Sequence, residues 1–100
     1  MFPALSLYSH KKHTATKAAA VSGAVMIYAA YVTANGANMD VNLIDALTDG
    51  GEDDLDINVL DGDCKMLHFP GGLSFATGLS ITIAGTGQLH LWTDKAQTAT

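Results

Sequence analysis

Residues 39–59, MDVNLIDALTDGGEDDLDINV, contain two short segments in which apolar and polar residues alternate strictly. The apolar positions of these segments are Met39, Val41, Leu43, Leu55, Ile57 and Val59. A period of two places one face of a β-strand on a core and the other face in water. The Asp-Gly-Gly sequence at 49–51 is typical of a turn, because glycine and aspartate tolerate positive φ angles. This stretch therefore predicts two half-buried antiparallel strands.

The same alternation continues towards the C-terminus. Residues 79–83, LSITI, repeat the pattern, and Leu89 and Leu91 share one face of the segment 88–93. Glycine-containing turn signals separate these segments, and Gly85-Thr86-Gly87 predicts a hairpin turn. Many short strands with regular turns predict an all-β fold. We expect a small antiparallel β-sandwich of about seven strands, either jelly-roll or immunoglobulin-like.

Residues 24–33, AVMIYAAYVT, differ because both faces of the predicted strand are apolar. Strict alternation places Val25, Ile27 and Tyr31 on one face and Met26, Tyr28 and Val32 on the other. One face would pack in the core, and the other would need a second layer or a neighbouring subunit to cover it. We therefore expect a homo-oligomer or capture by a partner protein.

The ends of the chain lie outside this pattern. Residues 1–20 predict an N-terminal arm, 21–93 the β-sandwich domain and 94–100 a polar C-terminal tail. The arm combines an apolar tip with a basic segment, and such an extended segment can add a strand to a partner's sheet edge. The candidate partner-binding residues of the arm and the long strand are Phe2, Leu5, Leu7, Tyr8, Lys11, Lys12, Lys17, Met26, Tyr28 and Val32.

Composition restricts the classes of function. The chain has 100 residues, a net charge of −5 and no arginine, so it is a single domain without the basic face that nucleic acids require. Its one cysteine, Cys64, cannot form an internal disulfide. The acidic residues gather between Asp40 and Asp63. They form either a solvated face or a docking surface for a basic partner.

No site for metal or catalysis is complete. Residues 54–58 match the first three ligand positions of a calcium-binding EF-hand loop, but Val59 occupies the position that requires glycine. His10 and His13 have no third zinc ligand nearby, and we expect both to be solvated on the arm. We expect no enzyme activity and no cofactor. A carbohydrate- or calcium-binding module remains an alternative.

The uncharged stretch 18–34 allows a membrane or secretion signal to be considered. It is short for a membrane span and contains Ser22, Gly23, Thr33 and two tyrosines. We expect strands here and no membrane partner. A secreted or membrane-anchored small binding domain is the alternative from another class of protein.

Two blocks of sequence carry a family resemblance. Residues 23–45, GAVMIYAAYVTANGANMDVNLID, and 69–85, FPGGLSFATGLSITIAG, resemble small β-domains of tailed-bacteriophage virion proteins. The resemblance implies a structural virion protein, made in the bacterial cytoplasm, with no catalytic residues. It points to a capsid decoration (cement) protein that binds the major capsid protein, as a trimer by analogy. A tail, adaptor or fibre-associated virion protein is the alternative.

Overall fold

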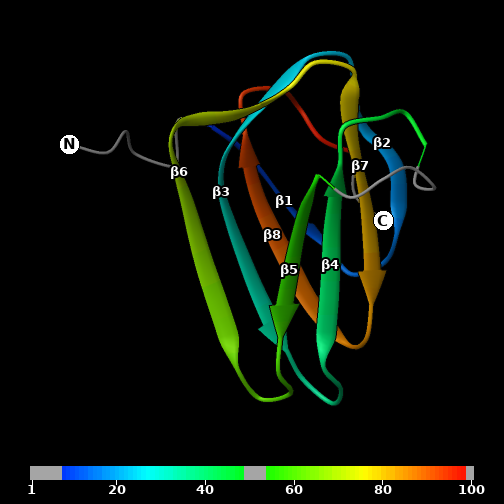
Figure 1. Ribbon diagram of the computed structural model, residues 1–100, viewed down its shortest axis with the longest axis vertical. Coiled ribbons are helices and arrows are strands. Elements are labelled where there is room, and N and C mark those ends of the chain that lie inside the picture. Colours follow the sequence, from blue (N-terminus) through cyan, green and yellow to red (C-terminus); the bar gives the residue numbers. More distant parts are fainter. Residues whose placement is uncertain (1–7, 49–53, 99–100) are drawn as a thin grey trace.

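The computed structural model describes residues 8–48 and 54–98, and these residues form eight β-strands in two sheets. The sheets have the orders β1-β8-β3-β6 and β2-β7-β4-β5, and every pair of neighbours is antiparallel (Figure 1). The strands are β1 (Ser9–His13), β2 (Lys17–Ser22), β3 (Val25–Ala34), β4 (Met39–Ile44), β5 (Leu55–Val59), β6 (Cys64–Phe75), β7 (Gly78–Ala84) and β8 (Gly87–Thr93). The all-β prediction is confirmed, with eight described strands rather than about seven.

The strand pairs are nested. β1 pairs with β8, β2 with β7, β3 with β6 and β4 with β5, and the β3–β8 and β4–β7 pairs complete the two sheets. Among the described strands, only β4 and β5 are consecutive in the chain and adjacent in one sheet. The predicted hairpin at Gly85-Thr86-Gly87 is therefore wrong, because this turn carries the chain from one sheet to the other. Glycine supplies the positive φ angle of a turn between two sheets as readily as it supplies the positive φ angle of a hairpin turn.

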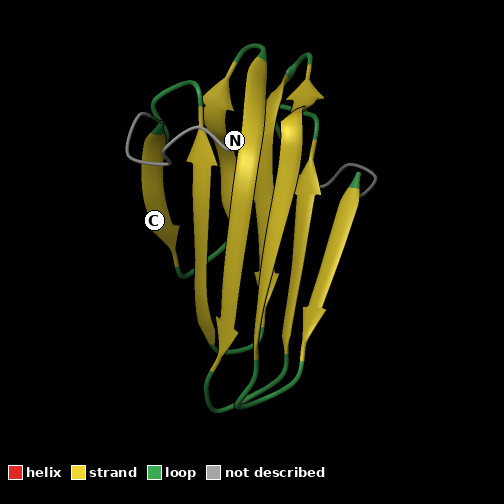
Figure 2. Ribbon diagram, turned by 90° about the vertical axis from the view of Figure 1, so that its left-hand side faces the viewer, coloured by secondary structure: helices red, strands yellow, loops and turns green. Residues whose placement is uncertain are grey.

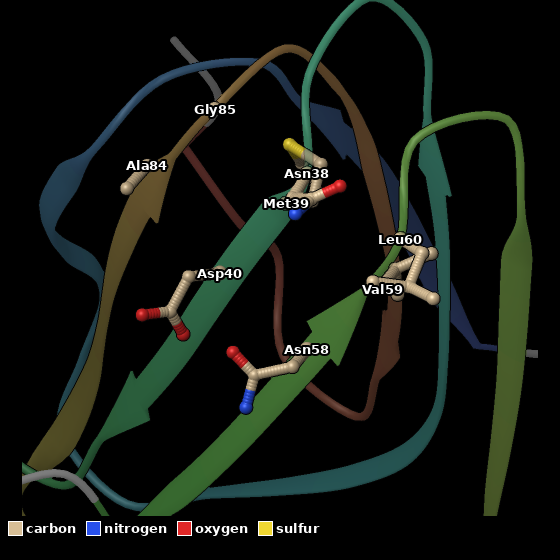
Figure 3. Close-up of a pocket in the computed structure, with 8 residues that line it drawn as sticks. All are labelled: Asn38, Met39, Asp40, Asn58, Val59, Leu60, Ala84 and Gly85. Atoms are coloured by element: carbon tan, nitrogen blue, oxygen red, sulfur yellow. The ribbon is translucent and has the colours of Figure 1, made fainter.

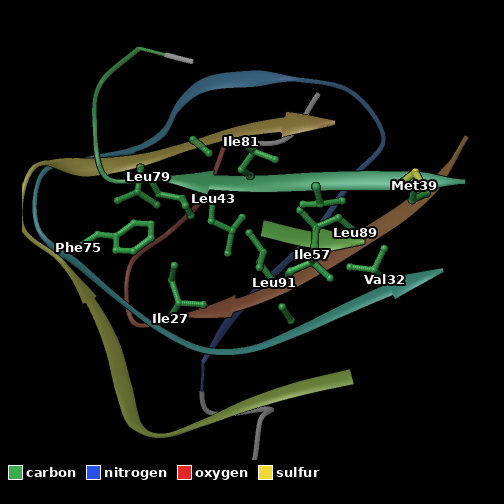
Figure 4. Close-up of a cluster of buried hydrophobic side chains, with 14 of the residues drawn as sticks. Ile27, Val32, Met39, Leu43, Ile57, Phe75, Leu79, Ile81, Leu89 and Leu91 are labelled. Atoms are coloured by element: carbon green, nitrogen blue, oxygen red, sulfur yellow. The ribbon is translucent and has the colours of Figure 1, made fainter. Parts of the chain in front are cut away.

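The core lies between the two sheets, and its side chains come from the alternating positions (Figure 4). Val41, Leu43, Ile81, Leu89 and Leu91 are completely buried. The molecule measures 20 Å along its shortest axis and 34 and 32 Å along the other two, as expected for two stacked sheets. Figure 2 shows the sandwich edge-on. The main stabilisation of the two layers comes from burial of apolar surface, which contributes a free energy of about 25 cal/mol per Å².

A β-bulge in β3 changes which residues of the strand lie on the core side and which on the outer side of the sheet. Ile27 is opposite Thr93 of β8 and Ala29 is opposite Trp92, so Tyr28 is an extra residue without a partner in the ladder. An extra residue reverses the alternation beyond it. Val32 is consequently completely buried in the core, and the prediction that it shares the outer face with Met26 and Tyr28 is wrong. Tyr31 points outwards instead.

The strand opposite this bulge accommodates it. Pro70, Gly71 and Gly72 are residue types typical of turns, but they lie inside β6. Four residues of β6 pass the single Tyr28. β6 is at a sheet edge, where proline removes no ladder hydrogen bond. A Cβ atom at Gly72 would lie 2.5 Å from Cε of Met26, so glycine makes room for that side chain.

The N-terminal prediction is wrong for the described part of the arm. β1 and β2 are edge strands of the two sheets, paired with β8 and β7. β1 reads SHKKH, without an aliphatic residue, so it gives no hydrophobic alternation to detect. Residues 1–7, which include Phe2, Leu5 and Leu7, lie outside the described residues. The tail prediction also fails at Gln97, which is only 6% exposed.

Candidate functional site

Side chains on the outer face of the first sheet form three rows across its strands. His10 of β1 is in register with Trp92 of β8, which is opposite Ala29 of β3, which is opposite His68 of β6. The next row contains Lys12, His90, Tyr31 and Met66, and the third contains Gln88, Thr33 and Cys64. We call these residues, together with Tyr8, Met26 and Tyr28, the histidine–aromatic face.

The rings of this face stack on one another. The His10 ring centroid lies 4.7 Å from that of Trp92 and 5.1 Å from that of His90, and Tyr8 stacks on Tyr28 at 4.1 Å. Ala29 lies on the same outer face but is completely buried, because larger side chains cover it. The face is thus a packed layer of rings, and it leaves Met66 38% exposed at its β6 side.

A chain of hydrogen bonds fixes the two histidines. Nε2 of His90 lies 3.2 Å from Oε1 of Gln88, which can only accept, so His90 donates there. Its Nδ1 then accepts from Nε2 of His10 at 2.8 Å. This arrangement requires a neutral His90. Burial lowers the pKa of His90 below its ordinary value, and positive charge on His10, Lys12 and His13 lowers it further.

The structure brings together some of the residues predicted from sequence. Tyr8, Lys12, Met26 and Tyr28 lie on the histidine–aromatic face. Lys11 alternates to the other side of β1, Lys17 begins β2 in the other sheet, and Val32 is in the core.

Ten residues of this face were not predicted as site residues. They are His10, Ala29, Tyr31, Thr33, Cys64, Met66, His68, Gln88, His90 and Trp92. A signal exists in the sequence, since His10 and Lys12, like His90 and Trp92, are two residues apart and so share a face of a strand. It is visible only once residues 9–13 are known to form a strand. The expectation that His13 is solvated is wrong, because that side chain is completely buried.

The outer face of the second sheet has the opposite character. Asp40 is opposite Asn58 and Asn42 is opposite Asp56, while Thr82 and Ala84 of β7 flank Asn42 and Asp40. These six residues form what we call the acidic face, and none of them is a cation. Lys65 reaches its margin, where Nζ donates to the Asn58 carbonyl oxygen at 3.0 Å.

A surface depression of about 500 Å³ lies at one end of the acidic face (Figure 3). The side chains of Asp40 and Asn58 lie side by side in it, and Leu60 at its rim is 68% exposed. Its other lining residues are Asn38, Met39, Val59, Ala84 and Gly85. Small-molecule sites enclose most of their ligand. This depression is open and would leave much of a small molecule in contact with water.

Within residues 8–48 and 54–98, no three His, Cys, Asp or Glu side chains are placed to hold a metal ion. None of these residues forms a helix that could cross a membrane, and the uncharged stretch 18–34 contributes most of β2 and β3. No protein-family model, curated protein or solved structure matches this chain.

Proposed function

We propose that the chain is a structural protein of a tailed-phage particle, and specifically a capsid decoration (cement) protein that binds the major capsid protein and its neighbours. The histidine–aromatic face is the observation that carries this proposal. Trp, Tyr and Met are enriched at protein interfaces, and Trp and Tyr are frequent among the residues that dominate binding energy. Here Trp92, Tyr28, Tyr31 and Met66 occupy one continuous sheet face.

The fold supports the proposal by analogy. The strand orders β1-β8-β3-β6 and β2-β7-β4-β5 correspond to a jelly roll. In this arrangement the first strand pairs with the last, the second with the seventh, and so on inwards. Viral capsid proteins and lectins both use this architecture, so the fold narrows the function without assigning it. The resemblance of residues 23–45 and 69–85 to virion β-domains favours the particle over the lectin.

The ring arrangement favours a protein neighbour over a sugar. Carbohydrate platforms present open ring faces, whereas one face of Trp92 is stacked on His10 and Tyr28 is stacked on Tyr8. His10 and Lys12 are exposed beside these stacked rings. A lysine ammonium and a protonated histidine suit the carboxylates and carbonyl oxygens of another protein.

The test is to locate the chain in purified particles of the phage that encodes it. We expect it in the head fraction, in a number comparable to that of the major capsid protein. A number comparable to that of tail or adaptor proteins would assign the alternative virion location. Absence from the particle would refute the proposal. Trp92→Ser should lower the occupancy of the particle, whereas Thr48→Ser, exposed and outside both faces, should not.

A further inference from the structure

The two outer faces of the sandwich carry opposite charge. The rows of the histidine–aromatic face contain Lys12 and three histidines, and they contain no carboxylate. Asp94 keeps its negative charge just beyond these rows at the end of β8, where its Oδ1 accepts a hydrogen bond from the Met26 N–H at 2.9 Å. The rows themselves are positive, because Lys12 is charged at neutral pH and each protonated histidine adds to that charge.

The acidic face presents the complementary groups. Asp40 and Asp56 occupy diagonal positions on β4 and β5, with Asn58 and Asn42 at the other two corners of the square. Carboxylate oxygens accept hydrogen bonds, and each amide both donates and accepts. Lysine, protonated histidine and the indole N–H of tryptophan are suitable donors to such a surface.

We propose that the histidine–aromatic face of one copy docks on the acidic face of a second copy of this chain. Pairing of like faces would bring Lys12 and the histidines against their own counterparts, or Asp40 and Asp56 against theirs. Like-charge contacts of this kind are unfavourable. Pairing of unlike faces removes that repulsion and gives the packed ring layer a protein cover.

The dimensions of the sandwich permit such a contact. Its two longer extents are 34 and 32 Å, and the two faces lie across the 20 Å axis. A face of this size can supply roughly 800 Å² per partner, the area of a standard protein–protein interface. The exposed Leu60 and Met66 lie at or beside the two faces and would lose apolar surface to water on docking.

This arrangement is heterologous, since each copy uses two different surfaces. A copy whose histidine–aromatic face is covered still offers its acidic face to the next, so association does not stop at a dimer unless the geometry closes a ring. The inference rests on the proposed function and deepens it by naming the neighbour that meets the histidine–aromatic face in the particle.

The test exchanges charge between the faces. Lys12→Glu makes the β1 edge of the histidine–aromatic face negative, and Asp56→Lys reverses the charge at one corner of the acidic face. Both positions are exposed, so folding is retained. Sedimentation of the full chain at low salt should show concentration-dependent association. Each variant alone should associate at least about tenfold more weakly, and added salt should weaken the parent.

An equimolar mixture of the two variants decides the matter. One contact in the mixture joins two unaltered faces. The other contact joins the K12E face to the D56K face, where the charges at the two altered positions are exchanged but still opposite, so association should recover. Lys95→Glu, an exposed reversal outside both faces, should associate like the parent. Circular dichroism and melting of each variant establish that it is folded.

Three outcomes would overturn the inference: a parent that stays monomeric at millimolar concentration, single variants that associate as well as the parent, or a mixture that does not recover. These outcomes are separate from the proposed function. A monomeric chain found in phage heads would remove the self-docking and leave the virion role. If the chain self-associates but is absent from particles, the proposed virion role is wrong. The docking of one copy on another would then still be correct, but it would not occur in a particle.

Discussion

Nε2 of His13 and Oε1 of Gln97 lie 3.0 Å apart, although 84 residues separate them in the chain. Nε2 of Gln97 in turn donates to the carbonyl oxygens of Leu91 at 3.0 Å and Ser9 at 3.3 Å. The C-terminal segment is therefore tied to the end of β1 and to β8. Because Oε1 of Gln97 accepts, His13 carries its proton on Nε2, and its buried Nδ1 has no hydrogen-bond partner among the described residues.

This arrangement predicts acid sensitivity. Burial lowers the pKa of His13 below 6.5, and the nearby His10 and Lys11 lower it further, although the hydrogen bond with Gln97 opposes the shift. The unfolded chain binds the proton first, so the free energy of unfolding should fall as pH decreases from 6.5 towards the lowered pKa. Urea unfolding from neutral to mildly acidic pH measures this dependence. His90, whose pKa is also lowered, adds a change of the same sign.

The His13→Gln variant separates the two contributions. It removes the titrating group at the buried position, so the dependence on pH should become shallower. His90→Gln should remove the remaining part that arises on the histidine–aromatic face. An H13Q protein with an unchanged pH profile would show that His13 does not titrate differently in the folded and unfolded states.

Gln97→Ala should destabilise the fold by about 1–3 kcal/mol, because it leaves the buried His13 side chain and the Leu91 carbonyl oxygen without their partners. Lys95→Ala changes an exposed side chain two residues away and should cost less than about 0.5 kcal/mol. Chemical denaturation of the two variants makes the comparison. Equal stability would mean that the tail contributes no net stability.

Truncation tests whether the N-terminal segment belongs to the sandwich. Deleting residues 1–7 removes none of the described strands, and the remaining chain should retain a cooperative thermal transition. Deleting residues 1–17 removes β1 and the start of β2, which exposes an edge of each sheet and removes His13 from the core. That shorter protein should lose the cooperative transition, and a stable truncated sandwich would contradict the strand assignment.

Gly85 is predicted to be intolerant of any side chain. Its φ is +102°, and a Cβ atom would overlap the Asn38 carbonyl of the neighbouring turn. Gly85→Ala should cost more than about 3 kcal/mol, since the backbone must move in addition to the strain of the positive φ. Gly62 has a φ of +83° with nothing near its Cβ position, so Gly62→Ala should cost only about 1–2 kcal/mol. Melting temperatures of the two variants distinguish these costs.

The bulge in β3 makes a prediction about adjacent residues. Val32→Asp should abolish stable folding, with a cost above about 4 kcal/mol, because it places an unpaired charge in the core. Tyr31→Ser changes the outer face, where Tyr31 is only partly buried, and should cost less than about 2 kcal/mol. The reverse order of stabilities would show that the alternation passes through β3 without interruption.

The sequence identified the polar segments between strands as turns, but it did not show which strands these turns connect. Asn35-Gly36 and Asp61-Gly62 are typical of hairpin turns, yet each links a strand of one sheet to a strand of the other. In the structure Asp61 Oδ1 accepts a hydrogen bond from the Gly36 N–H at 2.8 Å, and the Asp61 N–H donates to Oδ1 of Asn38 at 2.8 Å. Neighbouring turns thus hold one another, and no local pattern records which turn will be the neighbour.

Local alternation by itself determined the class of fold and the core positions of β4, β5, β7 and β8, because a period of two fixes which side chains share a face. Tertiary structure decided the rest. The polar sequence of β1 becomes a strand because β8 offers it a free edge, and Val32 enters the core because an extra residue at Tyr28 reverses the alternation. The two charged faces also depend on strand order, since His10 and His90 meet only when the first strand pairs with the last. Such long-range pairings are set by the packing of two complete sheets, which no single segment encodes.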